Sequence, residues 1–170
     1  MSSLVYRDLS VLRNSIFLNH KHHIFIEIIR DRSLVYALSS KTGLSLLKYA
    51  IYLKKNEMFM MILDEMDHDT ITPIHSFPSL IYATIYGDRI MMIKIINKFK
   101  NVNIVDPEHG FTALHILMIY KIKDYIKKAD LLLSHRVNPN ILDKYGKTVL
   151  HYAIELNDIR MINIINLYRK

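Results

Sequence analysis

Cysteine and tryptophan are absent from the 170 residues, and glycine and proline occur only four times each. Without cysteine the chain has no disulfide framework, no CxxC redox pair and no thiolate ligand for a metal. This absence is compatible with a reducing intracellular location, in the cytoplasm or the nucleus. Because no glycine-rich linker divides the sequence, we expect a single domain.

Long hydrophobic runs are also missing, although 51% of the residues are hydrophobic. Charged residues such as Lys54, Asp88 and Lys123 interrupt the apolar segments before about eighteen consecutive positions are reached. The first residues, Met1–Asp8, lack the basic and apolar segments of a signal peptide. We therefore expect a continuous hydrophobic core, no transmembrane helix and no membrane partner.

Motifs for catalysis, cofactors and metals are not found either. The sequence contains no GxGxxG, GxxxxGK[ST], GxSxG or HRD-type loop, and its carboxylates are scattered, so we expect neither an enzyme nor a bound cofactor. The densest histidine cluster is His20-Lys-His-His23. Adjacent histidines on a helix point about 100 degrees apart and no HExxH accompanies them, which favours a solvated connection over a zinc site. We predict no metal.

A surplus of positive charge leaves two interpretations open. The chain has 23 Lys and Arg against 16 Asp and Glu, which gives a net charge of +7 and a pI near 9.5. The lysines either keep an Ile-rich and Met-rich chain soluble, or they attract an acidic partner, nucleic acid included. No dense basic run is present, so charge alone does not decide between them.

An apolar doublet recurs along the chain with a period typical of helical repeats. Successive doublets are 33, 34, 36 and 33 residues apart. The doublets are Ile28-Ile29, Met61-Ile62, Ile95-Ile96, Leu131-Leu132 and Ile164-Ile165. The periodicity predicts a pair of short helices in each repeat. The predicted helices cover 45–54 and 56–66, 79–87 and 89–99, 112–121 and 124–135, and 148–156 and 158–168.

The repeated segments resemble the ankyrin-repeat family, whose repeat reads approximately DxxGxTPLHxAxxxGxxxxVxxLLxxGADxN. Gly110-Phe-Thr-Ala-Leu-His115 and Gly146-Lys-Thr-Val-Leu-His151 match its core, and Val137-Asn-Pro-Asn140 matches its turn. The resemblance implies an all-α solenoid of about four repeats over residues 40–170. It also implies that His115 and His151 hydrogen-bond between neighbouring turns. Residues 1–39 are expected to form a degenerate N-terminal helical cap, with helices near 11–19 and 24–31, continuous with the repeats as one domain.

Some positions depart from the family's pattern. The second period reads Pro78-Ser-Leu-Ile81 where TPLH is expected, which predicts an irregular helix start, and the third period carries about three extra residues near 121–128. Arg136 stands where a glycine usually follows the second helix, and a residue other than glycine there either adopts positive φ at a cost of about 1 kcal/mol or forces a different turn. Leu150 and Ile162 are expected in the core shared by the third and fourth repeats.

Ankyrin arrays present a long concave surface for binding, and the resemblance identifies its residues here. The family's variable positions lie seven and eight residues after the threonine of TPLH. They give a tyrosine strip, which we define as Tyr52, Leu53, Ile85, Tyr86, Ile119, Tyr120, Glu155 and Leu156. The turn tips add Lys41, Glu108, His109, Lys144 and Tyr145. Exposed apolar residues in such a row favour a protein interface, and the alternative is that they pack against neighbouring helices.

These features predict an intracellular, monomeric protein-interaction module. The Ile-, Lys-, Asn- and Tyr-rich composition with divergent repeats resembles virus-encoded ankyrin proteins of the poxvirus or polydnavirus type. Short viral proteins of this kind resemble IκB, which implies binding of a host NF-κB-family transcription factor, inhibition of NF-κB signalling and immune evasion. The alternative is a basic scaffold that binds an acidic protein or nucleic acid, of which nucleic acid is disfavoured.

Overall fold

The structure is a computed structural model that describes residues 12–20, 45–66, 78–99 and 101–169. Within these ranges the chain forms helices and no β-strand. The labelled helices are α3 (Leu46–Tyr52), α4 (Asn56–Asp64), α5 (Ser79–Tyr86), α6 (Arg89–Lys98), α7 (Ala113–Tyr120), α8 (Tyr125–Ser134), α9 (Val149–Glu155) and α10 (Ile159–Tyr168). The predicted all-α fold is confirmed, and the bounds of each predicted pair are within two residues of those observed.

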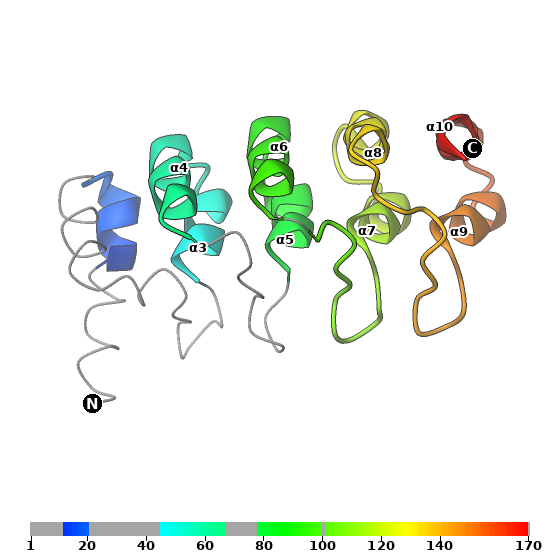
Figure 1. Ribbon diagram of the computed structural model, residues 1–170, viewed down its shortest axis with the longest axis horizontal. Coiled ribbons are helices and arrows are strands. Elements are labelled where there is room, and N and C mark those ends of the chain that lie inside the picture. The colour runs from blue at the N-terminus through cyan, green and yellow to red at the C-terminus, as the bar shows by residue number, and fades with distance from the viewer. Residues whose placement is uncertain (1–11, 21–44, 67–77, 100, 170) are drawn as a thin grey trace.

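The helices are arranged as a solenoid. α3, α5, α7 and α9 form one row of first helices, and α4, α6, α8 and α10 form a second row beside it (Figure 1). Each first helix packs against its own second helix and against the first helix of the next repeat. Helix starts in the second row, at Asn56, Arg89, Tyr125 and Ile159, are 33, 36 and 34 residues apart. The longer third period is therefore confirmed.

The N-terminal cap is only partly within the described residues. Residues 12–18 form a helix beside the first repeat, where one cap helix is predicted, and their Leu12 and Ile16 are fully buried (Figure 1). The other predicted cap helix, near 24–31, lies outside the described residues. The boundary between cap and repeats stays a prediction.

Polar side chains define where most of the helices begin. Thr112 and Thr148 cap α7 and α9, and in each case the histidine three residues later returns the bond, so that a capping box forms. Asp88 and Asp158 cap α6 and α10 by accepting from the backbone N–H three residues on. α5 begins instead after Pro78, with no side-chain cap, which confirms the predicted irregular start.

One continuous core runs through all the repeats, from Leu12 to Ile165. Methionines contribute to this core, since Met58, Met91 and Met92 are fully buried. The expectation for Leu150 and Ile162 was only partly right. Both pack against the core but are half-buried, because no described repeat follows the fourth one to cover them.

Candidate functional site

The three tyrosines of the tyrosine strip stand at the ends of successive first helices, although Tyr52 lies one repeat position earlier than Tyr86 and Tyr120. Tyr52, Tyr86 and Tyr120 are the last helical residues of α3, α5 and α7. Their side chains are 53%, 41% and 61% exposed, although they are large and largely apolar. Successive first helices lie side by side (Figure 1), so the last residues of these helices are at the same end of one row. The strip is thus open to a partner at each tyrosine.

Ring contacts hold part of the tyrosine strip in place. The rings of Tyr52 and Tyr86 meet edge to face, with centroids 5.5 Å apart, and the ring of Tyr86 lies 4.7 Å from that of Tyr82. Tyr82 is buried beneath them, and burial together with the two neighbouring tyrosines raises its pKa to about 12. Within the described residues no ring contact joins Tyr86 to Tyr120. The strip therefore consists of a fixed tyrosine cluster and a separate, freer Tyr120.

The other members of the strip differ in exposure. Leu53, Ile85 and Ile119 are half-buried and pack against the core, so the alternative of packing between helices applies to them. Leu156 is 51% exposed. Glu155 is exposed, and both of its carboxylate oxygens accept from Nζ of Lys147, at 2.7 and 2.9 Å. The aliphatic part of the strip is thus continuous with the core, and Glu155 is already paired.

The predicted turn-tip residues lie on two docked turns, except Lys41, which is outside the described residues. Glu108, Lys144 and Tyr145 are exposed, and His109 is half-buried. The backbone N–H of Lys144 donates to His109 O at 2.9 Å, and its ammonium donates to the carbonyl of Pro107 at 2.6 Å. Lys144 therefore joins neighbouring turns, while the ring of Tyr145 lies 6.5 Å from that of Phe111 and a carboxylate oxygen of Glu108 lies 3.9 Å from Nε2 of His109.

Buried carboxylates fold these turns. Asp106 accepts from the backbone N–H groups of Glu108, His109 and Phe111. Asp143 accepts from the backbone of Tyr145 and Lys147 and from the hydroxyl of Tyr152, the last at 2.6 Å. Burial alone would raise the pKa of Asp143, but these hydrogen bonds to its charged form outweigh burial and lower the pKa. The role of both carboxylates is therefore to hold the turns in shape.

His115 connects the third repeat to the fourth, as the resemblance implies. Its Nδ1 accepts from the backbone N–H of Thr112, so Nε2 carries the proton and donates to the carbonyl of Lys147 at 3.2 Å. Burial lowers the pKa of His115, which keeps the ring neutral. His151 forms the same capping box with Thr148 but is exposed. The predicted contact between turns is therefore confirmed for His115 alone.

Sequence reasoning missed two buried lysines. Lys48 is 2% exposed and stands three residues after the α3 cap, the position that His115 occupies in the third repeat. Burial lowers its pKa to about 8. Lys128 is 7% exposed, and its ammonium donates to the carbonyls of Thr84 and Gly87 at the end of α5. The burial of Lys48 could have been predicted from the sequence, because Lys48 aligns with the histidine of TPLH.

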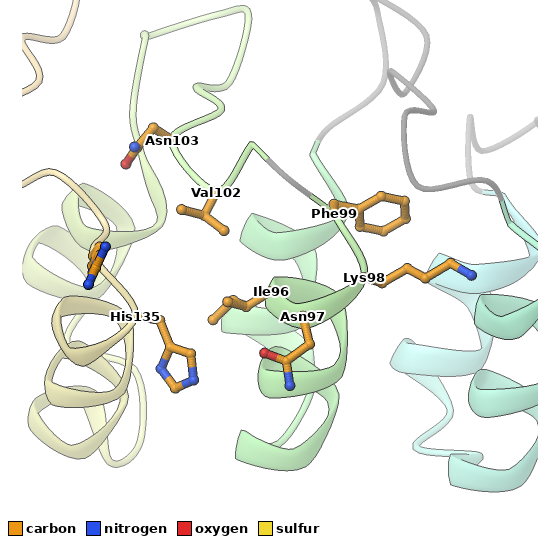
Figure 2. A pocket seen from close by; sticks show the side chains of 8 residues that line it. Ile96, Asn97, Lys98, Phe99, Val102, Asn103 and His135 are labelled. Atoms are coloured by element: carbon orange, nitrogen blue, oxygen red, sulfur yellow. The ribbon is translucent and has the colours of Figure 1, made fainter.

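A cleft of about 440 Å³ opens between the ends of α6 and α8, in the second row. The side chains of Asn97 and His135 face each other across it, whereas Lys98 points away, and its ammonium donates to Asp64 O (Figure 2). The Nδ1–H of His135 donates to the carbonyl of Leu131 at 2.8 Å. The cleft is thus bordered by a few polar groups, and it lies away from the first helices that carry the tyrosine strip.

The described residues contain neither a metal-ligand cluster nor a membrane-spanning helix. Across the described segments, no three His, Cys, Asp or Glu side chains are grouped to hold a metal ion. Of the predicted histidine cluster, only His20 is among the described residues. No helix in the part described is both long and apolar enough to cross a bilayer.

Comparison with known proteins gives a family match to the repeats. The family model described as ankyrin repeats, in three copies, matches residues 80–167, which is more than half of the chain. No curated protein matches the sequence. The matched residues run from the second residue of α5 to the last but one of α10 and include both docked turns.

Proposed function

Since the chain belongs to the ankyrin-repeat family, we propose that it recognises a partner protein through the tyrosine strip. The family consists of interaction modules rather than enzymes. Repeats of this kind bind through an extended surface made by equivalent positions of successive repeats. The observation that carries the proposal is the row of exposed tyrosines at the ends of α3, α5 and α7.

Physical chemistry supports this surface as a source of affinity. A tyrosine buries a large area on binding and has few side-chain rotations to lose, so it is favoured at the centre of interfaces. The contact between Tyr52 and Tyr86 restricts both rings before a partner arrives. Leu156 and the half-buried aliphatic residues extend the apolar surface along the row. Binding then costs less ordering of side chains.

We propose further that this partner is a host immune-signalling factor, with an NF-κB-family transcription factor as the first candidate, bound inside the cell. The support is the resemblance of composition and repeat divergence to virus-encoded, IκB-like ankyrin proteins. A direct test measures binding of a purified NF-κB-family dimer to this chain. Binding that loses affinity when the tyrosines are replaced supports the candidate, and the absence of any binding rules it out.

The tyrosine strip is tested independently of the partner's identity. Proteins captured from a host-cell lysate by the natural chain are compared with those captured by the Tyr86→Ala, Tyr120→Ala double variant. We expect the affinity for a partner captured in this way to fall by about 2 kcal/mol or more if both tyrosines are hot spots.

The matched control is Tyr168→Ala. This tyrosine is 37% exposed but lies on α10, in the second row, and its hydroxyl donates to Asp130. The control variant should bind like the natural chain. Equal capture by the natural chain and the double variant, with both folded by circular dichroism, would show that the strip is not the binding surface.

A further inference from the structure

Cationic side chains follow the tyrosine strip in successive repeats. They lie in or just after the connections between first and second helices, and each is exposed. These residues are Lys54 after Tyr52, Arg89 after Tyr86, and Lys121 and Lys123 after Tyr120. By contrast, α3, α5 and α7 contain no acidic residue. The end of the first-helix row is therefore bordered by positive charge.

Most of this positive charge is available to a partner. Within the described residues, Lys54, Arg89 and Lys123 form no ion pair, whereas the ammonium of Lys121 lies 3.3 Å from Asp158. The acidic residues of the same connections are already engaged. Asp88 caps α6, Asp158 caps α10 and accepts from Tyr125, and Asp124 lies 3.8 Å from the ammonium of Lys127.

The backbone at Lys54 has the left-handed conformation that also occurs at the equivalent residues Lys121 and Asn157 of the third and fourth repeats. Lys54 has a φ of +53°, in the left-handed region that glycine occupies at little cost. The equivalent place in the second repeat is Gly87, which also stands two residues before the second helix begins and has a φ of −85°. The first repeat thus places an exposed lysine at a left-handed position where glycine would cost less.

We propose that the tyrosine strip, together with Lys54, Arg89 and Lys123, binds a partner segment that combines apolar side chains with aspartate or glutamate carboxylates. This inference rests on the proposed function, because it specifies the chemistry of the partner at the same surface. Apolar side chains of the segment contact the tyrosines, and its carboxylates meet the cations at the edge. Edge charges of this kind accelerate association and select the partner.

The ring geometry favours a protein segment over a nucleic acid. Single-stranded nucleic acids bind through bases that stack on open aromatic faces. Here Tyr52 and Tyr86 contact each other edge to face, and Tyr86 also leans on Tyr82, so their faces are partly covered. Aliphatic side chains such as Ile85 and Leu156 lie along the same strip and suit apolar side chains rather than bases.

The test selects binders from a displayed library of random peptides on the full chain. Peptides are kept only if the Tyr86→Ala, Tyr120→Ala variant fails to retain them, so that they report on the strip. We expect these peptides to be enriched in Asp and Glu relative to Lys and Arg, with apolar residues between. Their affinity should fall as salt is raised.

Lys54→Gly then separates charge from fold. Removing the left-handed lysine should raise the unfolding midpoint. It should also lower the affinity for the acidic peptides roughly two- to fivefold at low salt. Two variants serve as controls. Asn157→Gly changes the equivalent left-handed residue of the fourth repeat, and Lys94→Gln removes an exposed charge from α6, so both should leave peptide affinity unchanged.

The outcomes distinguish the two proposals. Strip-dependent peptides that are neutral or basic would overturn the acidic partner while leaving the proposed function intact. A library in which no peptide depends on the tyrosines would contradict the proposed function, and the inference with it. Displacement of the peptides by single-stranded DNA at equal concentration would overturn the inference in favour of a nucleic acid.

Discussion

At the residue scale, Lys48 is the side chain whose burial is hardest to explain. It lies in the first repeat at the position of His115, but no hydrogen bond or ion pair from its ammonium reaches a described residue. At that position the neutral imidazole of His115 donates to a turn carbonyl, and no charge is buried. A buried ammonium, by contrast, loses its hydration. Burial accordingly lowers the pKa of Lys48 from 10.5 to about 8.

We predict that Lys48→Met stabilises the protein at pH 7, by roughly 1–3 kcal/mol in urea denaturation. Between the folded pKa near 8 and the unfolded value of 10.5, the unfolded chain holds more protons at Lys48. Stability of the natural chain should therefore rise with pH across that window, and the advantage of the variant should narrow. A less stable variant, or a difference independent of pH, would mean that the ammonium is well solvated in the fold.

At the element scale, two positions show how the backbone at the helix ends sets stability. Arg136 follows α8 with a φ of +62°, so of the two alternatives that the sequence leaves open it adopts positive φ. Gly87 ends α5 with a φ of −85°, but a Cβ there would lie 2.8 Å from the carbonyl oxygen of Ala83. Of these two positions, the one with positive φ therefore lacks glycine, and the one where a side chain would not fit has it.

Opposite effects follow for the two substitutions. Arg136→Gly should stabilise the chain by about 0.5–1 kcal/mol, because the left-handed strain is removed. Gly87→Ala should destabilise it by about 1–3 kcal/mol, because the added carbon meets backbone that cannot move away easily. Thermal unfolding followed by circular dichroism at 222 nm checks both. Changes of the same sign in the two variants would contradict the backbone account.

The stacking of elements gives a graded prediction for one leucine position. Leu114 is fully buried between repeats, whereas Leu150, at the same place in the fourth repeat, is half-buried. Leu114→Ala should cost about 2–5 kcal/mol through lost burial and a cavity, and Leu150→Ala roughly half as much. Chemical denaturation of both variants measures the ratio. A larger loss at Leu150 than at Leu114 would mean that the repeats are not stacked in this order.

At the scale of the whole molecule, sequence and structure agree on the periodic features. Spacing of apolar doublets and the Thr-x-x-His segments predicted the helix pairs, because both arise from contacts within one repeat or with the next. Lys48 and Lys144 were not understood from sequence, since the first is defined by burial and the second by a carbonyl 37 residues away. Exposure of the tyrosines was expected, but the contact of Tyr52 with Tyr86 depends on how two repeats are rotated against each other.

The position of the binding surface determines how the molecule as a whole meets a partner. Two surfaces compete for that role: the tyrosine strip on the first helices and the cleft between α6 and α8. NMR chemical-shift mapping of the isotope-labelled chain, titrated with its captured partner, distinguishes them directly. If the tyrosine strip binds the partner, we expect the largest backbone amide shifts at Tyr52, Tyr86 and Tyr120. Shifts concentrated at Asn97 and His135, with the tyrosines unchanged, would contradict it.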